Sequence, residues 1–157
     1  MRSIYKLVVC SLLTLSITSC EKDLLEKEQY QKEIYLIGAY NRVWTTEVSY
    51  SDEEVKTYFT VSSSGTLALD QDVNVKMKIN EELVDIYNKK YWTVLNEDKY
   101  YKSLEHDLYS IPSLENTVIK HAEGISAEVP VLIKTASLKI DQSYVIPVEI
   151  ESTTGYP

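Results

Sequence analysis

Hydrophobic and polar residues alternate along most of the chain with a period of two, which is typical of strands that bury one face in an antiparallel sheet. The stretch 73–79, "VNVKMKI", shows this pattern without a break, and 55–63, "VKTYFTVSS", shows it almost as clearly. Similar runs recur to the end of the sequence. The predicted strands are 33–38, 55–63, 73–79, 107–112, 116–124, 125–135 and 143–150.

The hydrophobic period changes after the third predicted strand. Asn80 is a good N-cap, and Leu83, Tyr87 and Tyr91 recur every four residues, as they would on one face of a helix. We therefore expect one short helix with both tyrosines in the core, and a further turn within 96–103.

Two prolines, Pro130 and Pro147, fall inside predicted strands. Proline lacks the backbone N–H that a ladder needs, so the strand around Pro130 is expected at a sheet edge or a bulge. Many strands around one helix predict a mainly β fold, an antiparallel β-sandwich with one short α-helix inserted between strands.

The amino terminus has the build of an export signal: a basic start followed by an uncharged apolar run over 7–17. That run is shorter than the roughly 20 apolar residues that span a bilayer. Residues 17–20, "ITSC", resemble a bacterial lipobox, which predicts removal of residues 1–19 and lipid attachment to Cys20. Cys10 lies in the removed segment, so a disulfide is excluded and a catalytic thiol is disfavoured.

Residues 20–32 are strongly charged after the cysteine and are interpreted as a solvated tether between the membrane and the domain. The start of this segment, "EKD" at 21–23, partly resembles the signal that exports Bacteroidetes lipoproteins to the cell surface. We therefore expect an outer-membrane lipoprotein, with the cell surface favoured over the periplasmic face.

The 157 residues carry a formal net charge of −8. A negative surface disfavours binding to nucleic acid. After removal of the leader, the remaining length suits one domain. Tyrosine is abundant, with 13 residues against two tryptophans and one phenylalanine.

The best metal-like pattern runs over 70–74, "DQDVN", with Glu81 at the spacing of an EF-hand loop. Position six of that loop is Val75 instead of glycine, and the following residues alternate like a strand. We therefore favour a polar turn into a strand and predict no metal or cofactor. The only histidines, His106 and His121, are interpreted as surface or strand residues.

No catalytic motif of a glycoside hydrolase, serine hydrolase or phosphate-binding loop is present in the sequence, so the chain is predicted not to be an enzyme. Three aromatic residues are candidates for stacking on sugar rings: Trp44, Trp92 and Tyr101. The alternative is that these rings pack the helix and its loop onto the sheet.

Several motifs in order resemble the DUF1735 family of Bacteroidetes, which is also described as the N-terminal domain of a Bacteroides family 18 endoglycosidase. The similar stretches are "VNVKMKINEELVDIYNKKY", "LNEDKYY" and "YVIPVEIES". The residues that match the family pattern are Asn80, Leu83, Tyr87, Asn88, Leu95, Tyr100, Tyr144, Ile146, Pro147 and Val148.

The resemblance implies an immunoglobulin-like sandwich over 33–157 on a cell-envelope lipoprotein, often ahead of a glycosidase, lectin-like or discoidin-like module. It implies no activity for the domain itself. Such domains usually continue into a final strand, so we expect either a fragment or a sandwich without its closing strand.

Three functions remain open at this point. The first is a non-catalytic, lipid-anchored module that binds glycan, or that serves as a spacer or docks a cell-surface protein partner, in polysaccharide acquisition. The second is an N-terminal accessory fragment of a larger glycoside hydrolase precursor. The third is an adhesin-like structural subunit whose open sheet edge accepts a strand from a partner.

Overall fold

The computed structural model describes residues 27–39, 43–140 and 142–156. Cys20, the leader and residues 20–26 of the predicted tether lie outside them. None of the helices in the described part is long and apolar enough to cross a membrane.

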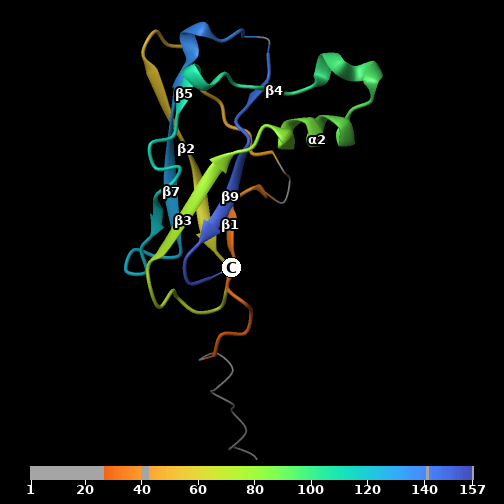
Figure 1. Ribbon diagram of the computed structural model, residues 1–157. Coiled ribbons are helices and arrows are strands. Elements are labelled where there is room, and N and C mark those ends of the chain that lie inside the picture. The colour runs from red at the N-terminus through yellow and green to blue at the C-terminus, as the bar shows by residue number, and fades with distance from the viewer. Residues whose placement is uncertain (1–26, 40–42, 141, 157) are drawn as a thin grey trace, which may run out of the picture.

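The strands form two main sheets and one small pair (Figure 1). The larger sheet is antiparallel in the order β1-β2-β7-β5, and the second has the order β6-β3-β9. The pair β4-β8 is parallel. The bounds are β1 Ile34–Leu36, β2 Glu54–Ser63, β3 Val73–Ile79, β4 Lys102–Ser103, β5 Tyr109–Ser110, β6 Thr117–Ile119, β7 Ser126–Lys134, β8 Tyr144–Val145 and β9 Val148–Thr153.

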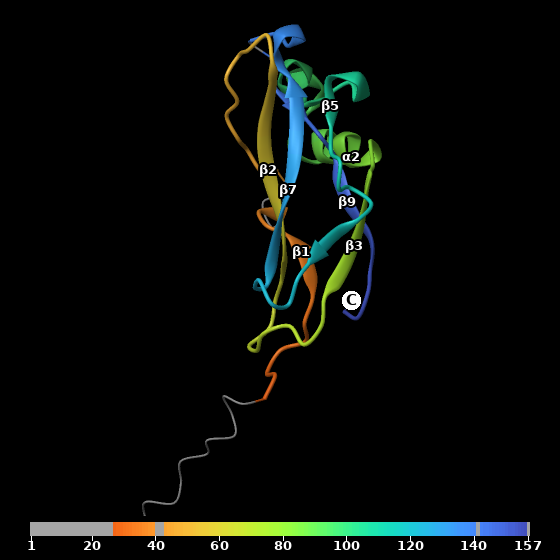
Figure 2. The same cartoon turned by 90° about the vertical axis from the view of Figure 1, so that its left-hand side faces the viewer.

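The two main sheets pack face to face, and Figure 2 shows them edge-on as two layers. The core between them contains Val61 and Val129 from one sheet and Val75, Met77 and Ile119 from the other, all almost completely buried. Burying a side chain of this size contributes about 1.5–3 kcal/mol. The predicted immunoglobulin-like β-sandwich with one short α-helix is confirmed, and so is the alternating burial of β2 and β3.

A second, smaller apolar cluster lies in the half of the molecule beyond this core. It consists of Leu104, Val131 and Ile133. Here β2 and β7 continue, but the second sheet is replaced by the short β4-β8 pair. The sandwich is therefore only partly filled in this half.

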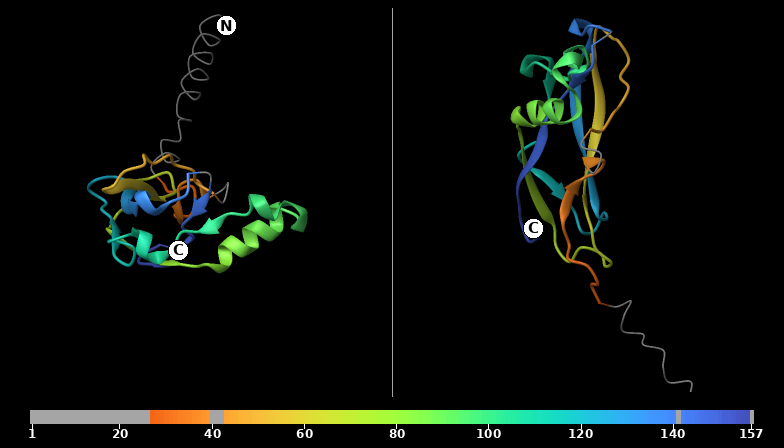
Figure 3. Two further views of the ribbon diagram at one scale, coloured as in Figure 1. Left: turned by 90° about the horizontal axis from the view of Figure 1, so that it is seen from above. Right: turned by 90° about the vertical axis from the view of Figure 1, so that its right-hand side faces the viewer.

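The helix α2, Glu82–Tyr91, begins as predicted beside Asn80, whose Oδ1 accepts the Glu82 N–H at 3.2 Å. The prediction of its buried face is wrong. The helix buries Val84 and Asn88, and Tyr91 remains 47% exposed. With the 3-10 helix η3, Val94–Lys99, it forms an arm that projects from the sandwich (Figure 3).

The two prolines act in different ways. β7 lies between β2 and β5, so the prediction of an edge strand is wrong for the strand as a whole. Ser63 N–H donates to Ile125 O at 2.8 Å. In an antiparallel ladder, hydrogen-bonded pairs alternate with pairs that exchange no hydrogen bond, and this bond makes the pair of Pro130 and Tyr58 one of the latter. The missing N–H of Pro130 would therefore point away from β2, toward the side of β5. Because β5 pairs only with residues 132–133 of β7, it needs no hydrogen bond from Pro130.

Pro147 interrupts the predicted strand 143–150 and divides it into β8 and β9, which pair with different partners. Its carbonyl accepts the Asn80 N–H at 2.9 Å. The single strand predicted there is wrong because the chain passes from one sheet to another at Ile146 and Pro147.

Residues 28–33 are held against the loop that follows β2. Glu28 accepts hydrogen bonds from the N–H groups of Thr66 and Leu67 and pairs with Lys32 at 2.6 Å. These contacts lower the pKa of the Glu28 carboxyl to about 2, chiefly through its hydrogen bond with Lys32. The polypeptide chain therefore enters the domain at one end of the sandwich, through a segment that is hydrogen-bonded to it (orange in Figure 1).

Candidate functional site

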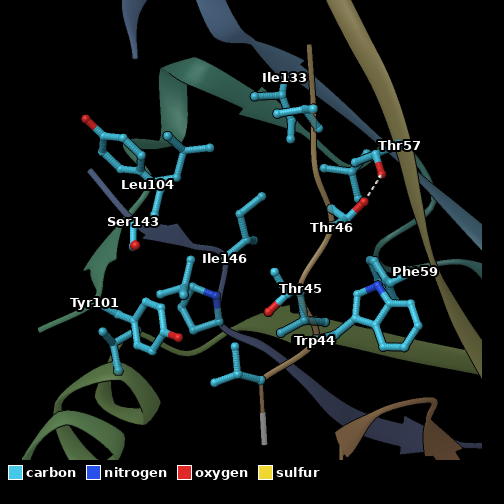
Figure 4. A pocket seen from close by; sticks show the side chains of 18 of the residues that line it. Trp44, Thr45, Thr46, Thr57, Phe59, Tyr101, Leu104, Ile133, Ser143 and Ile146 are labelled. Atoms are coloured by element: carbon cyan, nitrogen blue, oxygen red, sulfur yellow. Dashed lines mark hydrogen bonds between the residues drawn. The ribbon is translucent and has the colours of Figure 1, made fainter. Parts of the chain in front are cut away.

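The partly filled half of the sandwich contains a groove with a volume of about 980 Å³ (Figure 4). One wall is the inner face of β2 and β7, with Phe59 and Ile133. Residues 43–50 and the start of α2 form the sides, and residues 138–140 and 142–148 close the opposite wall. The groove exists because the short β4-β8 pair does not cover the sheet beneath it.

Residues 43–50 run beside β2 without belonging to any strand. Thr46 Oγ1 lies 3.5 Å from Thr57 Oγ1 of β2. Farther along, the buried hydroxyl of Thr135 accepts the Ser51 N–H at 2.9 Å and lies 3.2 Å from Ser49 O. Side chains therefore position this segment, and no hydrogen bond between its backbone and that of another described residue is found.

The indole of Trp44 lies against Gly38. A Cβ added to Gly38 would come within 2.7 Å of Trp44 Cε3, and φ of this glycine is +86°. The position therefore requires glycine both for its left-handed backbone and for the space that the indole occupies. Trp44 still exposes 60% of its surface, and Figure 4 shows it beside Phe59 in the groove.

The structure brings together two of the three predicted stacking residues. Trp44 and Tyr101 both line the groove, whereas Trp92 does not. Trp92 begins the turn of the arm, where Lys99 Nζ lies 5.6 Å from its ring centroid. Its Nε1 is buried and has no hydrogen-bond partner among the described residues.

Tyr101 owes its position to the helix. The buried Asn88 side chain bonds both to its N–H and to its carbonyl. The Tyr101 ring meets Tyr87 edge-on, with 5.5 Å between centroids, and Tyr87 lies 4.5 Å from Tyr91. Burial raises the pKa of Tyr87. These rings form a row along the helix that ends at the groove.

Several exposed apolar residues at the groove were not predicted from the sequence. Ile140 is 88% exposed, Tyr50 63% and Ile86 54%. They belong to separate segments and share no spacing, so no sequence pattern marks them as neighbours. Together with Trp44 they form an unusually apolar rim for an exposed surface.

The residues that resemble an EF-hand loop are separated in the structure, because Val73–Ile79 form strand β3 as predicted. Asp72 binds His121 Nδ1 at 2.7 Å, and Asp70 accepts a hydrogen bond from the Tyr156 hydroxyl. Glu81, beyond the other end of β3, bonds to Ser103. Within the described ranges, no group of three or more ligating side chains is placed to hold a metal ion.

Both histidines lie on the surface, as predicted, and each has a partner that the sequence did not reveal. The hydrogen bonds from His121 lower the pKa of Asp72. His106 Nδ1 lies 3.0 Å from the Tyr109 hydroxyl, and its Nε2 lies 3.6 Å from Glu81. Neither histidine lines the groove.

The charged residues of the protein are nearly absent from the groove. Among its described lining residues there is no aspartate or glutamate, and the only charged residue is Lys139. The described lining therefore contains no pair of carboxylates. Its polar side chains are mainly the hydroxyls of serine, threonine and tyrosine.

Comparisons with known proteins agree with this fold. A family model for an N-terminal domain matches residues 30–157. A multidomain protein including DUF1735 from Bacteroides ovatus is 18% identical, with a TM-score of 0.58, over 66% of this chain and 34% of its own. A structure of unknown function from Bacteroides ovatus is 15% identical, with a TM-score of 0.63, over 82% of this chain and 42% of its own.

A candidate carbohydrate-binding protein from Bacteroides ovatus ATCC 8483 is 26% identical, but its TM-score is only 0.46, over 67% of this chain and 29% of its own. The chain thus spans less than half of each of these solved structures. No curated protein matches it.

Proposed function

This chain belongs to the DUF1735-type family, and from that premise we propose that it is a non-catalytic module of the cell envelope that binds glycan in the groove beside Trp44. One observation carries the proposal. An exposed indole that packs against Gly38 stands next to the hydroxyls of Thr45 and Thr46, in a groove whose described lining contains no carboxylate.

Each part of this arrangement suits a sugar. A pyranose ring offers an apolar face that stacks on an aromatic ring, and its hydroxyls exchange hydrogen bonds with neutral polar groups. Because Trp44 is held by Gly38, little side-chain entropy is lost when a ligand stacks on it. A glycoside hydrolase would instead need two carboxyl groups about 5–9.5 Å apart across the bound sugar.

The proposed lipid anchor at Cys20 fits the placement of the groove. Residues 28–33 attach to the loop after Ser63, at one end of β2. Thr57, which lines the groove, precedes Ser63 by six residues on that strand. At about 3.3 Å per residue the groove lies roughly 20 Å from this attachment. A domain anchored through this end, at the cell surface, holds the groove away from the membrane.

A second candidate function follows from the comparisons. The matching family model is that of an N-terminal domain, and the similar solved chains are longer than this one. The domain then serves as an accessory to a module that follows it, such as a glycoside hydrolase. Reading the gene beyond codon 157 tests this candidate: an in-frame hydrolase region supports it, and an immediate stop codon excludes it.

Glycan binding is tested with the chain from residue 21 to residue 157, by affinity electrophoresis through gels that contain single polysaccharides. We expect at least one polysaccharide to retard the protein and Trp44→Ala to abolish the retardation. Tyr30→Ala is the matched control, because Tyr30 is 71% exposed but lies in the entry segment outside the groove. Retardation by no polysaccharide, or equal loss in both variants with folding intact, contradicts the proposal.

A further inference from the structure

The charge of the groove differs from that of the protein around it. The sequence contains 24 acidic and 16 basic residues, which give a net charge of −8. None of the acidic residues lines the described part of the groove, and Lys139 is its only cation. The described part of the groove is therefore nearly free of charge in a protein whose net charge is negative.

This distribution constrains the ligand. A cationic ligand would find no carboxylate with which to pair among the described residues that line the groove. An anionic ligand, such as a uronate or a sulfated sugar, would approach a protein of net negative charge with one exposed lysine as a counter-charge. Recognition of carboxylate or sulfate groups normally uses arginine forks or clusters of cations, and neither occurs in the part of the lining that the structure describes.

Apart from Lys139, the polar side chains in the described lining of the groove are uncharged. They include the hydroxyls of Thr45, Thr46, Thr57 and Ser143, of which Figure 4 shows several around the cavity. Beside them, the backbone of residues 43–48 makes no hydrogen bond to other described backbone. Hydroxyls and peptide groups both donate and accept, which matches the hydroxyl groups of a sugar.

The apolar parts of the groove are consistent with the same class of ligand. The indole of Trp44 supplies a flat face, and Tyr101 stands on the far side with its backbone fixed by Asn88. Much of the described lining is aliphatic, but aromatic faces and neutral hydroxyls also occur in it, so the groove is not a purely aliphatic pocket for a hydrocarbon chain. The segment 44–46, with one indole and two hydroxyls in succession, shows this mixture most clearly.

We infer that the ligand of the groove is a neutral glycan, and that polysaccharides bearing carboxylate or sulfate groups are excluded by charge. This inference rests on the proposed function, because it names the class of glycan that the same site takes. It adds a prediction of selectivity that glycan binding alone does not make.

The test compares a sugar polymer with its own charged derivative. A neutral polysaccharide that retards the protein in affinity electrophoresis is oxidised at C6 to introduce uronate groups, which leaves the backbone linkages intact. We expect the affinity for the oxidised polymer to be lower by a factor of about ten or more. A tenfold loss of affinity corresponds to about 1.4 kcal/mol of binding free energy. Binding of the unmodified polymer should change little with ionic strength, because no ion pair holds it.

Each outcome separates the two proposals. Equal or tighter binding of the oxidised polymer overturns the neutral-ligand inference, while the proposed function stands. The same holds if only pectic or sulfated polysaccharides bind and Trp44→Ala abolishes that binding. If neither class of polysaccharide binds, the proposed function fails and the inference fails with it. If the groove binds a fluorescent fatty acid but no saccharide, the proposed function and the neutral-ligand inference both fail.

Discussion

The side-chain amide of Asn88 holds the backbone of Tyr101 from both sides, donating to its carbonyl at 2.9 Å and accepting its N–H at 3.0 Å. The amide thus imitates the edge of a neighbouring strand and closes the loop between α2 and β4. Asn88 is only 4% exposed, so water does not replace these bonds when the amide is lost. This contact joins the projecting arm to the wall of the groove.

Asn88→Ala should therefore destabilise the domain by about 1–3 kcal/mol, because it leaves two backbone groups of Tyr101 without partners. Denaturant unfolding measures the change. Lys89→Ala is the matched control, since Lys89 is the exposed neighbour on the same helix, and it should remain within about 0.5 kcal/mol of the wild type. Equal stability of the two variants would show that the amide contributes nothing.

This contact also explains why the helix was predicted with the wrong face inward. The spacing of Leu83, Tyr87 and Tyr91 is a local pattern. The rotation of the helix about its own axis is set instead by the hydrogen bonds of Asn88 to a residue 13 positions later. The strands β2 and β3 were predictable because burial alternates along 54–59 of β2 and along most of β3, so that each buries one face of a sheet.

The groove was only partly predictable for a similar reason. Trp44 and Tyr101 were identified as candidates because flat aromatic rings can stack on the apolar face of a sugar ring. Trp92 lies outside the groove because of the direction in which the arm projects. The packing of segments that are distant in the sequence brings Tyr50, Ile86 and Ile140 to the rim. Neither property leaves a period or spacing in the sequence.

Gly38→Ala should destabilise the domain and displace Trp44. The substitution places a methyl group 2.7 Å from the indole and forces a side chain into a left-handed backbone, where the backbone term alone costs roughly 1–2 kcal/mol. Fluorescence in a Trp92→Phe background reports on Trp44 alone, and we expect its emission to shift.

Gly124→Ala is the matched control for this substitution. Its φ is also positive, at +134°, but no atom lies within 4 Å of the added methyl group. It should reduce stability without changing the emission of Trp44. If both variants shift the emission alike, the contact between Gly38 and Trp44 does not hold the indole.

Acid should weaken the attachment of the entry segment through Glu28. The pKa of Glu28 is lowered from 4.5 to about 2 in the folded protein, so the carboxylate stabilises the docked segment at a pH above 4.5. This contribution is lost as the pH falls from 4.5 through about 2, since protonation removes the charge that pairs with Lys32 and makes the carboxyl a weaker acceptor of the Thr66 N–H. The amide shift of Thr66, followed by NMR, measures the transition.

The variant Glu28→Gln cannot titrate at this position, so the Thr66 amide should lose its pH dependence in this range. Glu33→Gln changes a neighbouring carboxyl and should retain the transition. If the shift of Thr66 titrates in the same way without the Glu28 carboxyl, another group is responsible.

The hydroxyl of Thr135 should control how firmly residues 43–50 are held beside the groove. Thr135 is 3% exposed, and its Oγ1 accepts the Ser51 N–H while it donates to the carbonyl of Ser49 or Ser51. Thr135→Val keeps the shape but leaves these groups unpaired, at a cost of about 1–3 kcal/mol. We expect faster hydrogen exchange at the Ser51 amide and weaker glycan binding, because the segment that carries Trp44 is less ordered. Thr135→Ser keeps the hydroxyl and should retain both properties. If the valine variant binds glycan as the wild type does, despite rapid exchange at Ser51, the order of this segment is not required for the site.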